Sequence, residues 1–226
     1  MTIHFQRLSR RALLAGGAAT VTLRALGSPA LAQSAAKPLK IGMVTSLSGP
    51  FAALGESMRA GMQLFLKEQD NRLAGRTIEL VVEDDQAKPD EGVRKFRKLL
   101  GQDNADVVCG VISSAVALAI RDVVTDAKAL TFISAGSAND LARKAASPFV
   151  FRPTKTNWML GDTAGRWAFE KISKKGCITL GSDFAAGREY VGDFAASYRQ
   201  QGGQIGKQLW SPLGTADFGL SIGLQI

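Results

Sequence analysis

Apolar residues follow two alternating patterns along the chain. Short apolar runs such as 41–45, each closed by a polar turn, are typical of strands. Longer stretches such as 52–71 carry apolar residues at helical spacing, with Met58, Met62 and Leu66 on one face. This repetition predicts an α/β fold with a parallel sheet and helices on both faces. The expected elements are strands at 41–45, 77–83, 105–109 and 130–133, helices at 52–71, 90–101 and 114–127, and a turn at 73–76.

A second strand–helix series starts after residues 149–153, which we interpret as a crossover. It contains only two expected strands, too few to form a stable sheet alone. We therefore predict a lobe one at 39–153 and a partial, incomplete lobe two at 154–226. Trp167 is expected in the core, whereas the pattern does not decide whether Trp158 is buried. The expected elements of this series are helices at 156–172 and 188–200, strands at 176–180 and 204–210, and a loop at 181–187.

Residues 1–32 have the pattern of an export signal. Arg10 and Arg11 precede a Gly- and Ala-rich apolar stretch, and small residues ending at Ala32 offer a cleavage site. The apolar stretch is too short to cross a bilayer. The paired arginines favour a Tat-like signal, although the Sec route would also suit this stretch, and a disordered basic arm is the alternative. The sequence therefore predicts a periplasmic protein cleaved after Ala32, with a linker at 33–38.

The charge pattern argues against a nucleic-acid surface. The formal net charge is +8, but residues 1–32 contribute four arginines and no acidic residue. Elsewhere basic residues are interspersed with acidic ones, as at 91–98. Such mixing is typical of a solvated helix face. We therefore expect no nucleic-acid partner.

The residues needed for common kinds of catalysis are missing. The sole histidine, His4, lies within the expected signal, so the remaining chain can form neither a Ser-His-Asp triad nor a histidine metal cluster. Cys109 and Cys177 lie in separate apolar runs without CxxC spacing, which favours buried free thiols, with a disulfide as the alternative outside the cytoplasm. Asp84 and Asp85 are interpreted as a solvated strand end that caps the next turn. Because dinucleotide and phosphate-loop signatures are also missing, we predict no catalytic residue, no metal and no cofactor.

Serine and glycine residues collect at three of the expected strand ends. Because the carboxyl ends of parallel strands meet at one edge of a sheet, the three groups should lie close together. Helix capping explains Ser113 and Ser114 equally well. Three such groups at one edge nevertheless favour a small anionic or zwitterionic ligand. The groups are Ser46, Ser48 and Gly49; Gly110, Ser113 and Ser114; and Ser134, Gly136 and Ser137.

A series of short motifs follows in a fixed order along the chain. They are 40–42, 48–50 with Gly55 and Gly61, 83–86 with Pro89, 108–110 with 113–114, 133–137, 151–154 and 182–187. In this order they resemble the periplasmic leucine/branched-chain amino-acid-binding proteins, which are type I substrate-binding components of ABC importers. The resemblance extends over residues 38–217.

The resemblance implies a type I periplasmic-binding-protein fold that works as a two-lobed clamp. The clamp closes on a small solute without chemistry and is presented, as a monomer, to an ABC permease in the inner membrane. By this resemblance, Ser114 would bind the ligand carboxylate through its hydroxyl group. The carbonyl of Gly136, with the hydroxyl and N–H of Ser137, would hold the α-amino and carboxylate groups.

Three further positions would shape the side-chain pocket. Leu54 and Ala186 occupy places where the family often has an aromatic residue, and Phe184 is expected to compensate. The smaller side chains would widen the pocket. They favour a ligand larger than an aliphatic amino acid, such as an aromatic acid, an amide or a short peptide-like compound.

The resemblance ends before the chain does. Residues 219–226 do not continue the family pattern, and the acidic residue that usually meets the ligand ammonium group would lie beyond them. We therefore expect a C-terminally truncated copy. Two alternatives stay open, namely a truncated remnant that does not bind, and a soluble flavodoxin- or Rossmann-like enzyme.

Overall fold

The computed structural model describes residues 37–219. The expected signal, most of the expected linker and residues 220–226 lie outside this range. None of the helices in 37–219 combines the length and apolar character needed to cross a bilayer.

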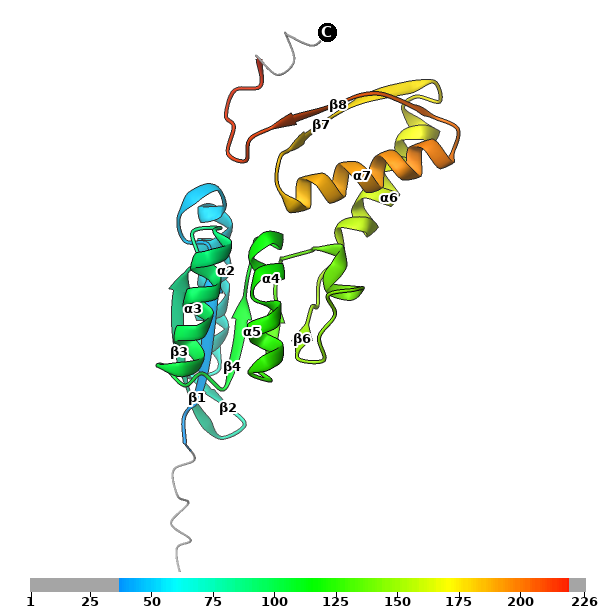
Figure 1. The fold of residues 1–226 in the computed structure, drawn as a ribbon. Helices are drawn as coiled ribbons and strands as arrows, with labels where there is room; N and C mark the ends of the chain where they lie inside the picture. The colour runs from blue at the N-terminus through cyan, green and yellow to red at the C-terminus, as the bar shows by residue number, and fades with distance from the viewer. Residues whose placement is uncertain (1–36, 220–226) are drawn as a thin grey trace, which may run out of the picture. The chain divides into compact units, whose positions relative to one another are not determined.

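The first part of the chain forms a six-stranded sheet in the order β2-β3-β1-β4-β5-β6 (Figure 1). β1 lies at its centre and pairs in parallel with β3 on one side and β4 on the other. A short strand that was not predicted, β2, ends at the first residue of the predicted turn at 73–76 and pairs antiparallel with β3. The predicted crossover contains β6, which extends the sheet beside β5. The strands are β1 (Leu39–Thr45), β2 (Arg72–Leu73), β3 (Arg76–Asp84), β4 (Val107–Gly110), β5 (Thr131–Ile133) and β6 (Val150–Phe151).

Helices cover both faces of this sheet, as the sequence predicted. Ile41 and Met43 of β1 pack in one cluster with Leu66 of α2. Val44, which points to the other face, packs in a second cluster with Phe96 of α3. The alternation along β1 therefore supplies both layers of the core. The helical segments are η1 (Gly49–Phe51), α2 (Ala52–Glu68), α3 (Pro89–Gly101), α4 (Ser114–Ala119), α5 (Arg121–Asp126) and η2 (Asn139–Ala142).

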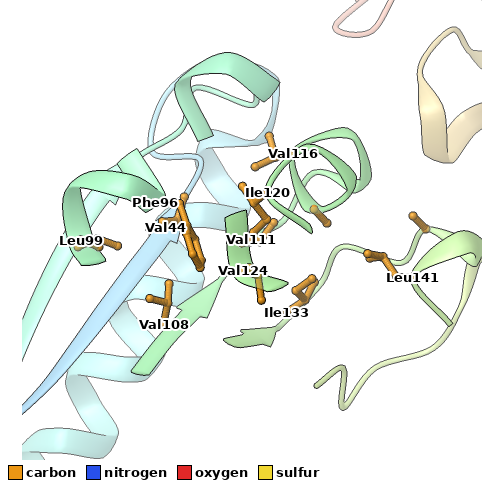
Figure 2. Close-up of a cluster of buried hydrophobic side chains, with 12 residues drawn as sticks. Val44, Phe96, Leu99, Val108, Val111, Val116, Ile120, Val124, Ile133 and Leu141 are labelled. Atoms are coloured by element: carbon orange, nitrogen blue, oxygen red, sulfur yellow. The ribbon is translucent and has the colours of Figure 1, made fainter. Parts of the chain in front are cut away.

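The second cluster is the larger one, and Figure 2 shows its side chains converging from strands and helices. Phe96 and Leu99 of α3 are fully buried in it. Ile120, also fully buried, marks the break between α4 and α5, where the sequence predicted one continuous helix. Its backbone angles, φ −77° and ψ −13°, depart from ideal α-helical values. The regular helix is therefore interrupted at a residue that faces the core.

The later part of the chain forms a two-stranded parallel sheet, β7–β8, with two helices. Helix α7 begins at Ala185, inside the stretch predicted as a loop at 181–187. The first turn of α7 packs closely on the strand before it, because a Cβ atom on Gly187 would overlap the Ser182 carbonyl oxygen. The elements are α6 (Asn157–Lys171), β7 (Gly176–Ser182), α7 (Ala185–Gln200) and β8 (Gln204–Ser211).

Helices α6 and α7 approach each other through their backbones. A Cβ atom on Gly161 would lie 2.8 Å from the Tyr190 carbonyl oxygen. One on Gly165 would lie 2.5 Å from the Phe194 carbonyl oxygen. No larger residue fits at either position without moving the helices apart.

Two predictions for aromatic and thiol side chains need correction. Trp167 is 56% exposed and not in the core, because the face of α6 that carries it has no covering element within residues 37–219. Cys109 is buried and free, as predicted. Cys177 is free but only partly buried, since it lies on β7 in the smaller sheet.

Candidate functional site

The first serine group holds the end of β1 against the end of β3. The Ser46 hydroxyl donates to Asp85 Oδ1 at 2.5 Å. The Ser48 hydroxyl donates to Asp84 Oδ2 at 2.6 Å. Both serines therefore serve the junction between two strands, and their hydroxyl protons are not directed at a ligand.

The two carboxylates differ in their surroundings. The N–H of Ala87 donates to Asp85 Oδ1 at 2.8 Å, so the predicted capping of the turn is confirmed. The predicted solvation is wrong for Asp85, which is fully buried. Burial raises the pKa of Asp85, against the hydrogen bonds from Ser46 and Ala87. Burial also tends to raise the pKa of Asp84. The hydrogen bonds that Asp84 accepts, the strongest of them from the Ser48 hydroxyl, outweigh burial, so the pKa of Asp84 is lowered.

The second and third serine groups meet at the ends of the neighbouring strands β4 and β5. The N–H of Ser137 donates to Ser114 Oγ at 3.1 Å, and both residues are buried. The Ser137 hydroxyl donates to the Ala135 carbonyl oxygen at 2.7 Å. Gly136 lies between Ala135 and Ser137 in the chain, and a Cβ atom on Gly136 would lie 3.0 Å from the Ala117 Cβ. The structure thus brings together three of the predicted ligand residues, Ser114, Gly136 and Ser137.

Ser113, the neighbour of Ser114, caps α4. Its side chain accepts from the Val116 N–H at 3.4 Å. The helix-capping interpretation is therefore confirmed for Ser113.

The three predicted pocket residues lie in different settings. Leu54 is 49% exposed on α2. Phe184 precedes α7, and its ring centroid lies 5.9 Å from that of Phe51. Ala186 is buried in the first turn of α7. A direct lining role fits the exposed Leu54 and the aromatic pair more readily than the buried Ala186.

A polar cluster that the sequence did not reveal lies next to Ser137. The Glu189 carboxylate, on α7, accepts from the Asn139 backbone N–H at 2.9 Å and from Asn157 Nδ2 at 2.6 Å. Burial raises the pKa of the neighbouring Tyr190, while a hydrogen bond with Ser137 acts in the opposite direction. The two hydrogen bonds to Glu189 join residues that are 32 and 50 positions apart in the sequence, so no local pattern could indicate them. Asn157 directly follows Thr156, the N-cap of α6, so its polar side chain would pass for part of an ordinary helix start.

A separate groove of about 360 Å³ lies over α6, α7 and β7. Thr179 contributes a buried hydroxyl to it, and the other lining side chains are mostly apolar. None of the predicted site residues lines this groove. The lining residues are Leu160, Gly161, Ala164, Thr179, Leu180, Tyr190, Val191 and Phe194.

Comparison with known proteins places these features in a family. The sequence pattern of the periplasmic binding protein family matches residues 38–226. The Leu/Ile/Val-binding protein homolog 6 of Brucella abortus (strain 2308) is 28% identical over 201 residues, which cover 88% of this chain and 51% of that protein. The chain spans about half the length of the curated relatives it matches.

Two solved structures share the fold and part of the sequence. An ABC-transporter solute-binding protein of R. palustris in complex with benzoate has a TM-score of 0.78 and 28% identity, covering 83% of this chain and 52% of that chain. A second, from Rhodopseudomonas palustris BisB5 in complex with 3,4-dihydroxybenzoic acid, has a TM-score of 0.75 and 28% identity, covering 81% and 50%. The predicted type I fold is thereby confirmed. From Pro38 onward, this chain belongs to the periplasmic binding protein family.

Proposed function

We propose that this chain supplies the carboxylate-binding wall of an extracytoplasmic solute-binding protein that serves an ABC importer. The observation that carries the proposal is the buried pair Ser114 and Ser137 at adjacent strand ends. Ser114 Oγ accepts a hydrogen bond from Ser137, and the Ser114 hydroxyl proton is not used in that bond. It could therefore be donated to a ligand carboxylate, a charge-assisted bond stronger than one between neutral groups.

The solute we propose is a small carboxylate, with aromatic acids preferred over aliphatic amino acids. The related structures that hold benzoate and 3,4-dihydroxybenzoic acid support an aromatic acid. The absence of an aromatic side chain at Leu54 and at Ala186 supports a ligand that brings its own ring. The Gly136 carbonyl would help to orient the ligand, and Phe184 would contact its ring.

The cellular setting is part of the same proposal. The chain would be exported, cleaved after Ala32 and active in the periplasm as a monomer. Its partner would be an ABC permease in the inner membrane, to which it would deliver the solute without chemistry. The family match and the signal-like residues 1–32 support this setting.

The test is ligand-dependent thermal stability, with titration calorimetry for the affinity. Benzoate, 4-hydroxybenzoate and L-leucine are the probes. At a concentration about 100-fold above Kd, a true ligand should stabilise the fold by about 2.7 kcal/mol and raise the melting temperature by several degrees. Ser114→Ala should abolish the benzoate shift.

The control variant is Ser57→Ala, which removes an exposed hydroxyl that bonds to the Ala53 carbonyl within α2. It should leave the benzoate shift unchanged. If none of the three probes changes the melting temperature of the unmodified chain, the proposed function is wrong.

A second candidate is a remnant that does not bind. The apolar side chains left exposed in the later part of the chain favour it, among them Leu160, Trp167 and Ile178. This candidate predicts a far-UV circular dichroism signal of normal strength together with a lost near-UV signal. A sharp near-UV spectrum would argue against it.

A further inference from the structure

A carboxylate on α7 ties down the segment that carries Ser137. Both hydrogen bonds to Glu189 converge on one oxygen, Oε2. One donor is the backbone N–H of Asn139, two residues after Ser137. The other is the side-chain amide of Asn157, the first residue of α6. The bonds are 2.9 and 2.6 Å long and charge-assisted.

The same donors lead back to Ser137 itself. The backbone N–H of Asn157 donates to the Ser137 carbonyl oxygen at 2.9 Å. Ser137 is thus held through its carbonyl by Asn157 and through the following chain by Asn139. Glu189 fixes both of these residues at once. A shift of α7 would therefore change the position of Ser137.

Further contacts keep Asn139 in one orientation. Its Nδ2 donates to Asp193 Oδ2 at 2.7 Å. Its Oδ1 accepts from the Trp158 backbone N–H at 2.7 Å. With the N–H held by Glu189, every polar atom of the side chain and the backbone donor is engaged. Asn139 therefore has little freedom to turn away from α7.

We infer that Glu189 is a positioning residue for solute binding, which acts through Asn139 and Asn157 to hold Ser137 in its binding geometry. The inference rests on the proposed function, in which Ser114 binds the solute carboxylate while the N–H of Ser137 donates to Ser114 Oγ. It adds that binding at the edge of the larger sheet is coupled to the placement of α7. Solute affinity should accordingly depend on a residue that does not touch the solute.

The test compares Glu189→Gln with Glu170→Gln. The first variant keeps the shape of the side chain but removes the charge that both donors need. Glu170 lies exposed on α6, so its variant makes the same change of charge away from the cluster. We expect Glu189→Gln to weaken benzoate binding about tenfold, the size of effect typical for a lost hydrogen bond to a charged group. Glu170→Gln should leave the affinity unchanged.

A purely structural role would give a different result. Glu189→Gln would then lower the melting temperature but leave the benzoate Kd unchanged at temperatures where the variant is fully folded. That outcome would overturn the inference. Glu189→Asp keeps the charge on a shorter arm and should show a smaller loss of affinity. It replaces Glu189→Gln if that variant does not fold.

Backbone hydrogen exchange provides a second test of the inference that needs no ligand. In Glu189→Gln, the amides of Ser137 and Asn139 should exchange about tenfold faster, while those of β1 keep their rates. Unchanged exchange at both amides would refute the positioning role. If the unmodified chain binds no probe, the proposed function fails, and the exchange result still decides whether Glu189 holds the segment.

Discussion

The larger sheet with its helices and the smaller sheet with its helices are built from the same strand–loop–helix units, yet they bury their side chains very differently. Phe96 and Leu99, on a helix of the larger-sheet region, are fully buried. Trp167 and Ile178, in the smaller-sheet region, are each 56% exposed. Local apolar patterns are similar in both regions. Burial therefore depends on how many neighbours an element has, and less on its own sequence.

The central strands illustrate this dependence. β1 pairs with a strand on each side and has helices on both faces. β7 pairs with β8 alone, within the part of the chain that the structure describes. Its apolar residues alternate as in any strand, but Ile178 and Leu180 have no covering layer there. The predictions below test this contrast, starting with the largest expected effect.

Truncating a core side chain should separate the two regions most clearly. Phe96→Ala should lower the free energy of unfolding by about 3–5 kcal/mol, because it leaves a cavity in a fully packed cluster. Trp167→Ala removes a larger but exposed side chain and should cost less than about 1 kcal/mol. Urea unfolding measures both. Equal losses would mean that the smaller-sheet region is as tightly packed as the larger one.

The glycines at the two strand–helix junctions provide a second comparison. A Cβ atom on Gly55 would overlap the Ser46 carbonyl oxygen, and one on Gly187 would overlap the Ser182 carbonyl oxygen. Gly55→Ala should destabilise by about 1–3 kcal/mol, as expected for overpacking in a rigid setting. Gly187→Ala should cost less, because the smaller sheet can yield. The matched control is Gly61→Ala, also on α2, which has open space and should stabilise by about 0.5–1 kcal/mol.

A partly buried ion cluster around Glu83 provides a pH-dependent test of the larger-sheet region. The Glu83 carboxylate accepts from Lys95 at 2.5 Å and from Lys98 at 2.6 Å. Burial acts to raise the pKa of Glu83, but the hydrogen bonds from the two lysines outweigh it and lower the pKa. A lowered pKa in the folded state stabilises the fold above the unfolded pKa, and this stabilisation is lost as the pH falls through the folded one.

Glu83→Gln should therefore lower the free energy of unfolding by about 1–3 kcal/mol at pH 7. The difference in the free energy of unfolding between Glu83→Gln and the unmodified chain should disappear below about pH 4. Glu79→Gln is the control on the same strand, since Glu79 forms an exposed pair with Lys40 at 3.6 Å and should contribute less than about 1 kcal/mol. A gap that persists at low pH would contradict the assignment.

The two cysteines report on each region separately. Burial raises the pKa of Cys109 to about 11, so its thiol should react slowly. The pKa of Cys177 is also raised by burial, against a hydrogen bond with Tyr198, but its side chain is partly exposed. At pH 8, iodoacetamide should modify Cys177 at least about tenfold faster than Cys109. Mass spectrometry, with Cys177→Ser to isolate Cys109, measures the rates, and similar rates would remove the contrast.

Much of the fold could be predicted because it depends on local spacing. The central strands and α2 and α3 lie close to their predicted ranges. β2 and β6 were missed because two-residue strands leave no periodic signal. Trp167 was placed wrongly because a helical pattern cannot tell whether a covering element exists. The error at Trp167 therefore concerns the neighbours of α6 and not the conformation of the helix itself.

The candidate site was predictable only in part, for the same reason. Strand ends in a parallel sheet meet at one edge, so the proximity of Ser114 and Ser137 follows from topology. The hydrogen bond from Ser46 to Asp85 joins residues 39 positions apart in the sequence. The hydrogen bond from the Asn139 N–H to Glu189 joins residues 50 positions apart. Such pairs are specified by tertiary packing and leave no trace in local sequence.

The close approach of α6 and α7 has a mechanical consequence. Their contact at Gly161 and Gly165 is made by backbone, with no long side chain in between that could adopt another rotamer. Because no long side chain separates the two backbones at these glycines, α6 and α7 are in direct contact there. A displacement of α7 that begins near Glu189 would therefore reach α6 through backbone contact, without a change of side-chain rotamer in between.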